Sequence, residues 1–223
     1  MEKLLIMCEG PNEKEIIKIL LENDLLKFTE DDLLGLTPYH ARQIKSSGQV
    51  KTELNIYPGQ VRILRIGDKQ SDKLVIPSEY KDKILSVDKY CTKPELEMLF
   101  ILAENLEQDF EKLKSSMKAK TFAKEHIYLG KRNYDNSTAF YTEYFGENPK
   151  LLVDCIKKYH KHNGSHDKEL VDIIPRLHQH RIQRLHQILV IQSADSTCNG
   201  SQYNKKDPFV MLKINSFLLS RTA

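Results

Sequence analysis

The stretch "KLLIMCEGPNEKEIIKILL", residues 3–21, joins a strand pattern directly to a helix pattern. Residues 3–8 form a short continuous apolar run, which is typical of a strand that is buried on both faces. Asn12 and Glu15 have the spacing of a capping box, which predicts that a helix begins there. The apolar stripe of that helix consists of Ile16, Ile17, Leu20 and Leu21.

The chain continues as an alternation of strands and helices. Strands are predicted at 60–68 and 83–91, and helices at about 94–113, 134–145 and 149–161. Residues 29–48 are expected to hold a loop and a short helix that stops at the Ser-Ser-Gly sequence. Pro94 suits the first position of a helix, because its missing N–H would be unpaired there anyway. The pattern predicts an α/β fold with a mostly parallel sheet flanked by helices, and a helical C-terminal half.

Composition limits the class of protein. The 223 residues are enough for one α/β domain, alone or with a small appendage, and 29 % charged residues favour a globular chain. A net charge of +3 is too small to identify a nucleic-acid partner, so any basic footprint must be local. We expect no membrane partner, because no apolar run approaches the length of a membrane span. Four isolated cysteines predict reduced thiols and a cytoplasmic protein.

The C-terminal part has a different composition. Six of the eight histidines lie between His160 and His186. We therefore predict a boundary near residue 165, with an α/β domain and helical extension at 1–164 and a small atypical tail at 165–223. Histidine pairs in this region lack cysteine or carboxylate partners at known metal-binding spacings, which favours exposed polar residues over metal ligands.

Carboxylates occur where two of the predicted strands end. Glu9 follows the first strand and Asp68 follows the second, with Glu13 and Asp72 four residues after each. In an open α/β sheet, ligands bind beyond the carboxyl ends of the strands, so Glu9 and Asp68 are expected to converge there. Carboxylate oxygens suit a hard cation such as Mg²⁺. The alternative for Glu13 is a favourable first-turn residue, and for Asp72 a solvated loop charge.

Glu97 is the only polar residue in the segment "LEMLFILA", residues 96–103. A helix that is apolar all round is buried, and a buried carboxylate needs a partner, which we expect to be a cation or a basic side chain. Glu95 is expected in the first turn of the same helix, where the helix dipole favours a negative charge.

Three short motifs resemble those of a known family. "CEGPNE" (8–13), "RIGD" (65–68) before "KQSDK", and "KPELEM" (93–98) are similar to segments of TOPRIM-fold proteins, in particular the RloB-like branch associated with bacterial restriction and abortive infection. The likeness covers roughly residues 3–160. The family usually has Asp-x-Asp in its second element, whereas Gln70 stands at the second Asp position here.

The resemblance implies a set of metal and catalytic residues. Glu9, Asp68 and Glu97 would form the acidic centre and hold Mg²⁺ or Mn²⁺, supported by Glu13 and Asp72. It also implies a nuclease that cleaves DNA or RNA in anti-phage defence, with nucleic acid and an ATPase of a defence system as partners. The alternative is a degenerate module that binds nucleic acid or protein without cleaving it, which the residue at position 70 favours. Nucleotidyl transfer is least favoured, because primases that share the fold generally carry further domains.

A local basic footprint lies between Lys112 and Arg132, where seven Lys or Arg residues accompany one acid. Such a stretch is typical of a surface that binds a phosphate backbone, and nearby aromatic side chains would stack on bases if they were exposed. Lys131 and Arg132 are the residues we expect at the scissile phosphate, with Lys131 as the catalytic one. The alternative is a solvated helix face beside core aromatics. The predicted nucleic-acid-binding residues are Lys118, Lys120, Lys124, Lys131 and Arg132.

Overall fold

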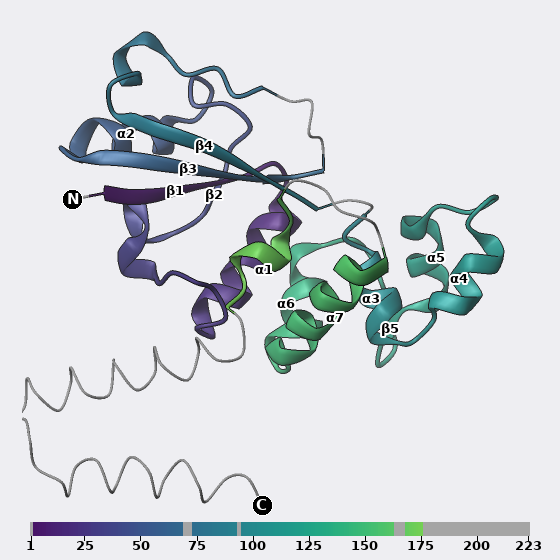
Figure 1. The fold of residues 1–223 in the computed structure, drawn as a ribbon. Helices are drawn as coiled ribbons and strands as arrows, with labels where there is room; N and C mark the ends of the chain where they lie inside the picture. Colours follow the sequence, from purple (N-terminus) through teal and green to yellow (C-terminus); the bar gives the residue numbers. More distant parts are fainter. Residues whose placement is uncertain (1, 69–72, 93–94, 163–167, 176–223) are drawn as a thin grey trace, which may run out of the picture. The chain divides into compact units, whose positions relative to one another are not determined.

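The computed structural model describes residues 2–68, 73–92, 95–162 and 168–175, which belong to one compact unit, Met1–Pro175 (Figure 1). The last described segment is part of this unit. The backbone N–H of Cys91 donates to the Lys168 carbonyl at 2.9 Å, and Ile173 is buried in the main core. The compact unit therefore extends past the predicted boundary near residue 165.

A parallel sheet forms the centre of the unit. Within the described residues it has four strands in the order β2-β1-β3-β4, and all neighbours are parallel. The strands are β1 (Glu2–Cys8), β2 (Tyr39–His40), β3 (Gln60–Gly67) and β4 (Ile84–Cys91). The α/β prediction and its three strands are confirmed. Strand β2 was not predicted, because two residues are too short for a recognisable pattern.

Helices cover both faces of the sheet (Figure 1). Alternate residues of β1 point to opposite faces, so Ile6 packs with the core of α1, α3, α6 and α7 while Leu5 packs with that of α2. The α-helices are α1 (Pro11–Glu22), α2 (Gly48–Ile56), α3 (Met98–Ala103), α4 (Glu107–Leu113), α5 (Ala119–His126), α6 (Thr138–Gly146) and α7 (Pro149–His162). The 3-10 helices are Glu30–Asp32, Leu34–Leu36, Ser78–Tyr80 and Leu170–Ile173. A small hairpin pairs β5 (Tyr128–Leu129) with β6 (Arg132–Asn133).

The helix predicted at 94–113 is instead two helices, α3 and α4. The chain turns at Asn105, whose φ of 55° lies in the left-handed region. Asparagine tolerates this conformation better than most residues, so it ends a helix readily. The apolar spacing continues through the break because Leu106 donates its N–H to the Ile101 carbonyl at 2.9 Å, which keeps the chain close to α3.

Two helix boundaries also differ from the prediction. Helix α1 has Gly10 at the N-cap and Pro11 at its first position, so Asn12 lies inside the helix and the predicted capping box is wrong. The Ser-Ser-Gly sequence does not stop a helix but begins α2, because the Ser47 hydroxyl accepts a hydrogen bond from the Val50 N–H at 3.3 Å.

The aromatic residues near the basic stretch mostly belong to the core. Phe100 packs against five aromatic rings of the 134–145 segment, with centroids 4.8–5.5 Å apart. The buried rings are Phe122, Tyr134, Phe140 and Tyr141, whereas Tyr128 is half-exposed. Core aromatics are thus the correct alternative for all of them except Tyr128.

The cysteines of the described residues, Cys8, Cys91 and Cys155, are buried free thiols. Burial raises the pKa of Cys155 to about 11, so this thiol stays protonated at neutral pH. Among the described helices, none combines the length and the apolar character that crossing a membrane requires.

Candidate active site

The carboxyl ends of the parallel strands meet at one edge of the sheet. Glu9 directly follows β1, Asp68 follows β3 and Thr92 follows β4. The backbone N–H of Glu9 donates to the Ile66 carbonyl at 2.8 Å, and that of Thr92 donates to the Gly67 carbonyl at 3.0 Å. These two hydrogen bonds extend the ladders by one residue, so the positions of Glu9 and Thr92 beside the end of β3 are fixed by the backbone.

A cavity of about 380 Å³ opens at this edge. Four carboxylates line it, from Glu13, Asp68, Glu95 and Glu97. Its basic lining residues are Arg42 and Lys120, and its neutral polar ones are Asn12, Thr92, Asn136 and Tyr141. Its volume is within the range of sites that bind small ligands or single nucleotide-sized groups.

Two glycines make space for the acidic side chains. A Cβ at Gly10 would collide with Oε2 of Glu13, and a Cβ at Gly67 would collide with Oε2 of Glu9. The carboxylates therefore lie directly against these bare backbone positions. This explains the Glu-Gly-x-x-Glu spacing at 9–13: the glycine between the two acids lets the second one fold back over the start of α1.

The acidic side chains influence one another. The pKa of Glu13 is raised, first because burial disfavours its charged form, and then because the carboxylates of Asp68, Glu9 and Glu97 repel that charge. A hydrogen bond to backbone partly opposes this rise in pKa. Residues from the three motifs are therefore near enough to Glu13 to influence its pKa, but of Glu9, Asp68 and Glu97 only Asp68 and Glu97 line the cavity.

Glu97 is buried, as predicted, with 8 % of its surface exposed. Its partner among the described side chains is not the expected basic group but the Tyr134 hydroxyl, which donates to Oε1 of Glu97 at 3.2 Å. The same hydroxyl lies 2.8 Å from Asn136 Oδ1 and 3.0 Å from the Tyr141 hydroxyl. Burial raises the pKa of both tyrosines and the charge of Glu97 raises it further, so they remain neutral donors. A neutral donor orients Glu97 and leaves its negative charge in place.

Glu95 has a different position from the one expected. It precedes α3 and its Oε2 accepts a hydrogen bond from the backbone N–H of Lys120 at 3.3 Å, at the second position of α5. Its carboxylate therefore stabilises the N-terminus of a neighbouring helix instead of its own. This contact also holds the start of α5 against the cavity, which is where Lys120 lies.

The lining residues have the chemistry that a hydrated Mg²⁺ ion requires, because the atoms that would coordinate it are hard carboxylate, amide and hydroxyl oxygens. Two of these oxygens, Asn12 Oδ1 and Thr92 Oγ1, are buried and have no hydrogen-bond partner. In the described part of the chain, however, no three or more His, Cys, Asp or Glu side chains are arranged to hold a metal ion. Mg²⁺ usually keeps several waters and is bound by one or two carboxylates, so it does not require such a group. Asp72 and Gln70 lie outside the described residues.

The predicted basic residues differ in their contacts and in whether they line the cavity. Lys118, Lys120 and Lys124 are exposed along α5, and Lys131 is exposed in the turn of the β5–β6 hairpin. Arg132 binds the Glu143 carboxylate through Nη1 at 2.8 Å and the Asp135 carboxylate through Nη2 at 2.7 Å, which raises its pKa. Neither Lys131 nor Arg132 lines the cavity. Lys120 and Arg42 are the basic side chains that do.

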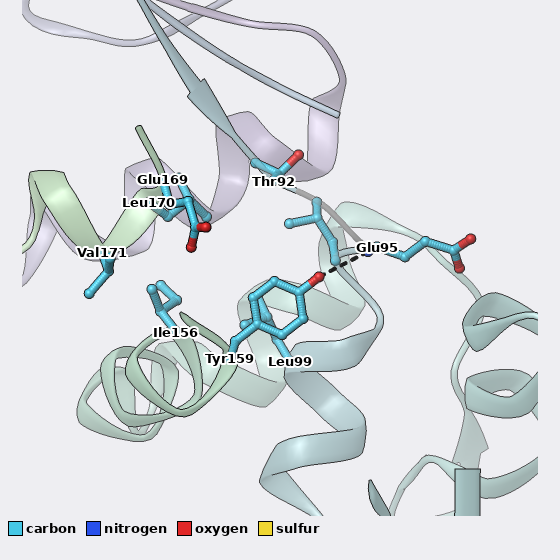
Figure 2. A pocket seen from close by; sticks show the side chains of 9 residues that line it. Thr92, Glu95, Leu99, Ile156, Tyr159, Glu169, Leu170 and Val171 are labelled. Atoms are coloured by element: carbon cyan, nitrogen blue, oxygen red, sulfur yellow. Dashed lines mark hydrogen bonds between the residues drawn. The ribbon is translucent and has the colours of Figure 1, made fainter. Parts of the chain in front are cut away.

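A second, smaller cavity of about 20 Å³ adjoins this edge of the sheet (Figure 2). Thr92 and Glu95 line both cavities, and the Glu95 N–H donates to the Tyr159 hydroxyl at 3.2 Å. The volume is sufficient for one water molecule. Glu169 also lines it and pairs with His160, whose Nδ1 lies 2.9 Å from Oε2. His160 is exposed, as predicted, and its ring is bound to a buried acid.

Sequence reasoning missed several lining residues. Thr92 directly follows a predicted strand, so the rule that identified Glu9 and Asp68 applied to it equally. Arg42 follows the two-residue β2, and its Nε donates to the Glu9 carbonyl at 3.2 Å. The spacing of Asn12 and Glu15 predicts a helix cap at Asn12. Its Nδ2 instead donates to Asn136, a residue far away in the sequence.

No protein-family model, no curated protein and no solved structure matches this chain. The resemblance to TOPRIM-fold proteins therefore rests on the three sequence motifs.

Proposed function

We propose that this protein is a Mg²⁺-dependent, TOPRIM-type nuclease that hydrolyses phosphodiester bonds of DNA or RNA. One observation supports the proposal: the carboxylates of Glu13, Asp68, Glu95 and Glu97 line one cavity beyond the strand ends, where burial, and then the charges of Asp68, Glu9 and Glu97, raise the pKa of Glu13. Gathering the buried carboxylates of Glu9 and Glu97, the half-buried one of Glu13 and the exposed one of Asp68 disfavours folding through mutual repulsion. Perturbed carboxylates of this kind, beside a cavity, are typical of functional sites.

Four acidic residues have a part in the proposed reaction. Glu9, Asp68 and Glu97 would hold the cation, and Tyr134 keeps Glu97 in a fixed orientation through its hydroxyl. When bound, Mg²⁺ would stabilise the charge on the phosphate and make a water molecule more acidic. Hydrolysis joins the water oxygen to phosphorus and breaks one P–O ester bond, and the leaving ester oxygen takes up a proton from solvent. Glu13, whose pKa is raised, accepts the proton that the water loses on a carboxylate oxygen.

Two basic side chains complement the phosphate at the cavity. Arg42 and Lys120 lie in its lining and would neutralise the oxygens that do not react. Lys120, which lines the cavity, and Lys124 are one helical turn apart on α5, so they present one exposed basic surface. This surface would bind the substrate backbone in a salt-dependent manner. The expected ATPase partner and the role in anti-phage defence are proposed from the resemblance alone.

A cleavage assay with DNA and RNA substrates tests the proposal. Wild type should cleave one of them in Mg²⁺ or Mn²⁺ and lose activity in EDTA. Asp68→Asn should lower the rate by about 100-fold or more, the scale expected when transition-state electrostatics are lost. Asp82→Asn, which changes an exposed aspartate before β4, is the matched control and should cleave like wild type. An inactive wild type, or an Asp68→Asn variant as active as wild type, would contradict the proposal.

A second candidate is a binding module that has lost the chemistry. The observation in its favour is that no three acidic, histidine or cysteine side chains among the described residues are arranged around a metal position. The residue at position 70 points in the same direction, because the usual second Asp is replaced by Gln. This candidate predicts nucleic-acid binding that persists in EDTA and in Asp68→Asn but is weakened by Lys120→Ala and Lys124→Ala.

A further inference from the structure

Thr92 presents a polar group that the fold does not use. The residue is 4 % exposed, and its backbone N–H is bound to the Gly67 carbonyl at 3.0 Å. Its hydroxyl, Oγ1, is buried without any hydrogen-bond partner. Figure 2 shows this hydroxyl on the side of Thr92 that faces away from Glu169. Thr92 also lines the acidic cavity.

Asn12 presents a second unused oxygen on the same cavity. Its Nδ2 donates to the carbonyl and to Oδ1 of Asn136, at 3.2 and 3.0 Å. These contacts fix the orientation of the amide, because a flipped amide would place its oxygen against two acceptors. Asn12 Oδ1 is therefore a defined acceptor, and it has no partner.

The two unpaired oxygens belong to residues that line the same cavity. Among the residues that the structure describes, these are the two buried side-chain N or O atoms without a partner, and both residues line one cavity. A buried polar atom without a partner disfavours folding, and buried polar atoms in native proteins are nearly always paired. Valine at position 92 would fill the same space without that penalty. A ligand in the cavity would supply the missing partners.

The chemistry of the two oxygens selects the kind of ligand. An amide oxygen only accepts hydrogen bonds, and the oxygens of a phosphodiester also only accept, so Asn12 Oδ1 cannot pair with the phosphate. The surrounding carboxylates, Glu13 and Asp68, also repel an anion. A water molecule bound to a cation donates hydrogen bonds strongly, and Mg²⁺ retains several such waters.

We propose that Thr92 Oγ1 and Asn12 Oδ1 bind the hydration shell of the divalent cation held by the acidic cavity. This inference rests on the proposed function and adds two positioning residues to it. Outer contacts of this type orient a metal site, and their loss typically weakens metal affinity by about 10- to 100-fold.

Thr92→Val tests the inference, because valine keeps the shape and removes only the hydroxyl. In EDTA its thermal midpoint should equal or exceed that of wild type. In calorimetric titrations with MgCl₂ alone, its affinity should fall about 10-fold or more. Thr92→Ser keeps the hydroxyl and should bind Mg²⁺ like wild type. Thr52→Val, at an exposed position of α2, is the matched control and should change neither quantity.

The outcomes separate this inference from the proposed function. If Thr92→Val binds Mg²⁺ like wild type while Asp68→Asn does not bind it, the inference is overturned and the proposed function stands. If wild type binds no Mg²⁺, both fail. If Thr92→Val does not fold, Thr92→Ala repeats the titration with the smaller side chain. Unchanged affinity in that variant also overturns the inference.

Discussion

Gly67→Ala is the substitution that tests most sharply how the acidic site is packed. Gly67 ends β3, and its φ lies outside the left-handed region, so alanine adds no backbone strain there. The added Cβ would lie 2.8 Å from the Cβ of Glu9 and still closer to its Oε2. The Cβ of Glu9 cannot swing away, because the Glu9 N–H is bound to the Ile66 carbonyl at 2.8 Å.

The expected cost follows from this contact. Extra atoms in a well-packed site typically cost about 1–3 kcal/mol, and here the strain falls on a proposed metal ligand. The matched control is Gly48→Ala at the start of α2, where an added Cβ meets nothing within 4 Å. That change should be neutral or should stabilise the fold by about 0.4–1 kcal/mol, because it restricts the unfolded chain.

Urea denaturation followed by circular dichroism measures both free energies of unfolding, and calorimetry measures Mg²⁺ affinity. Gly67→Ala should be less stable than wild type and should bind Mg²⁺ more weakly, whereas Gly48→Ala should bind it normally. A Gly67→Ala variant with the stability and Mg²⁺ affinity of wild type would show that the Glu9 carboxylate does not lie against Gly67. The reasoning about the site would then be refuted.

Two further substitutions test the electrostatics of the cavity. The folded-state pKa of Glu13 is raised above 4.5, so its contribution to stability is present below that pH and is lost as pH rises through the raised pKa. In EDTA, the stability of wild type relative to Glu13→Gln should therefore fall as the pH rises from 4.5 towards neutral. Mg²⁺ should reduce this difference in stability. Equal pH profiles of the two proteins would contradict a raised pKa of Glu13. Tyr134→Phe removes the hydroxyl that donates to Glu97 and should lower the free energy of unfolding by about 1–3 kcal/mol. Tyr128→Phe is its control, because Tyr128 is half-exposed and its hydroxyl donates to the Glu125 carbonyl at 2.6 Å in an exposed hydrogen bond. It should change stability by less than about 0.5 kcal/mol, so equal losses in both variants would exclude a special role for Tyr134.

The sheet could be predicted because its information is local. A continuous apolar run located β1, and segments rich in strand-forming residues located β3 and β4. Parallel strands end at a common edge, so the residues after them, Glu9 and Asp68, could be expected to lie close together. Glu97 was identified by its isolation among apolar residues, which also predicts its burial.

The remaining features depend on contacts between distant parts of the chain. The amide of Asn12 looks like a helix cap until the fold brings Asn136 beside it, 124 residues later. A sum of charges over residues 112–132 includes Arg132 as an unpaired cation, but in the fold its guanidinium is bound by the carboxylates of Asp135 and Glu143. Lys120 lies among equivalent lysines in the sequence, and only its contact with Glu95 places it at the cavity. Periodicity and spacing contain none of this information.

Anomalous diffraction from crystals soaked in MnCl₂ tests the central claim most directly. The claim is that carboxylates from separate parts of the chain hold one divalent cation beyond the strand ends. It predicts one strong manganese peak within about 2.5 Å of a carboxylate oxygen of Asp68 and of either Glu9 or Glu97, and its loss in Asp68→Asn. The absence of a peak in the cavity, or an undiminished peak there in Asp68→Asn, would contradict it.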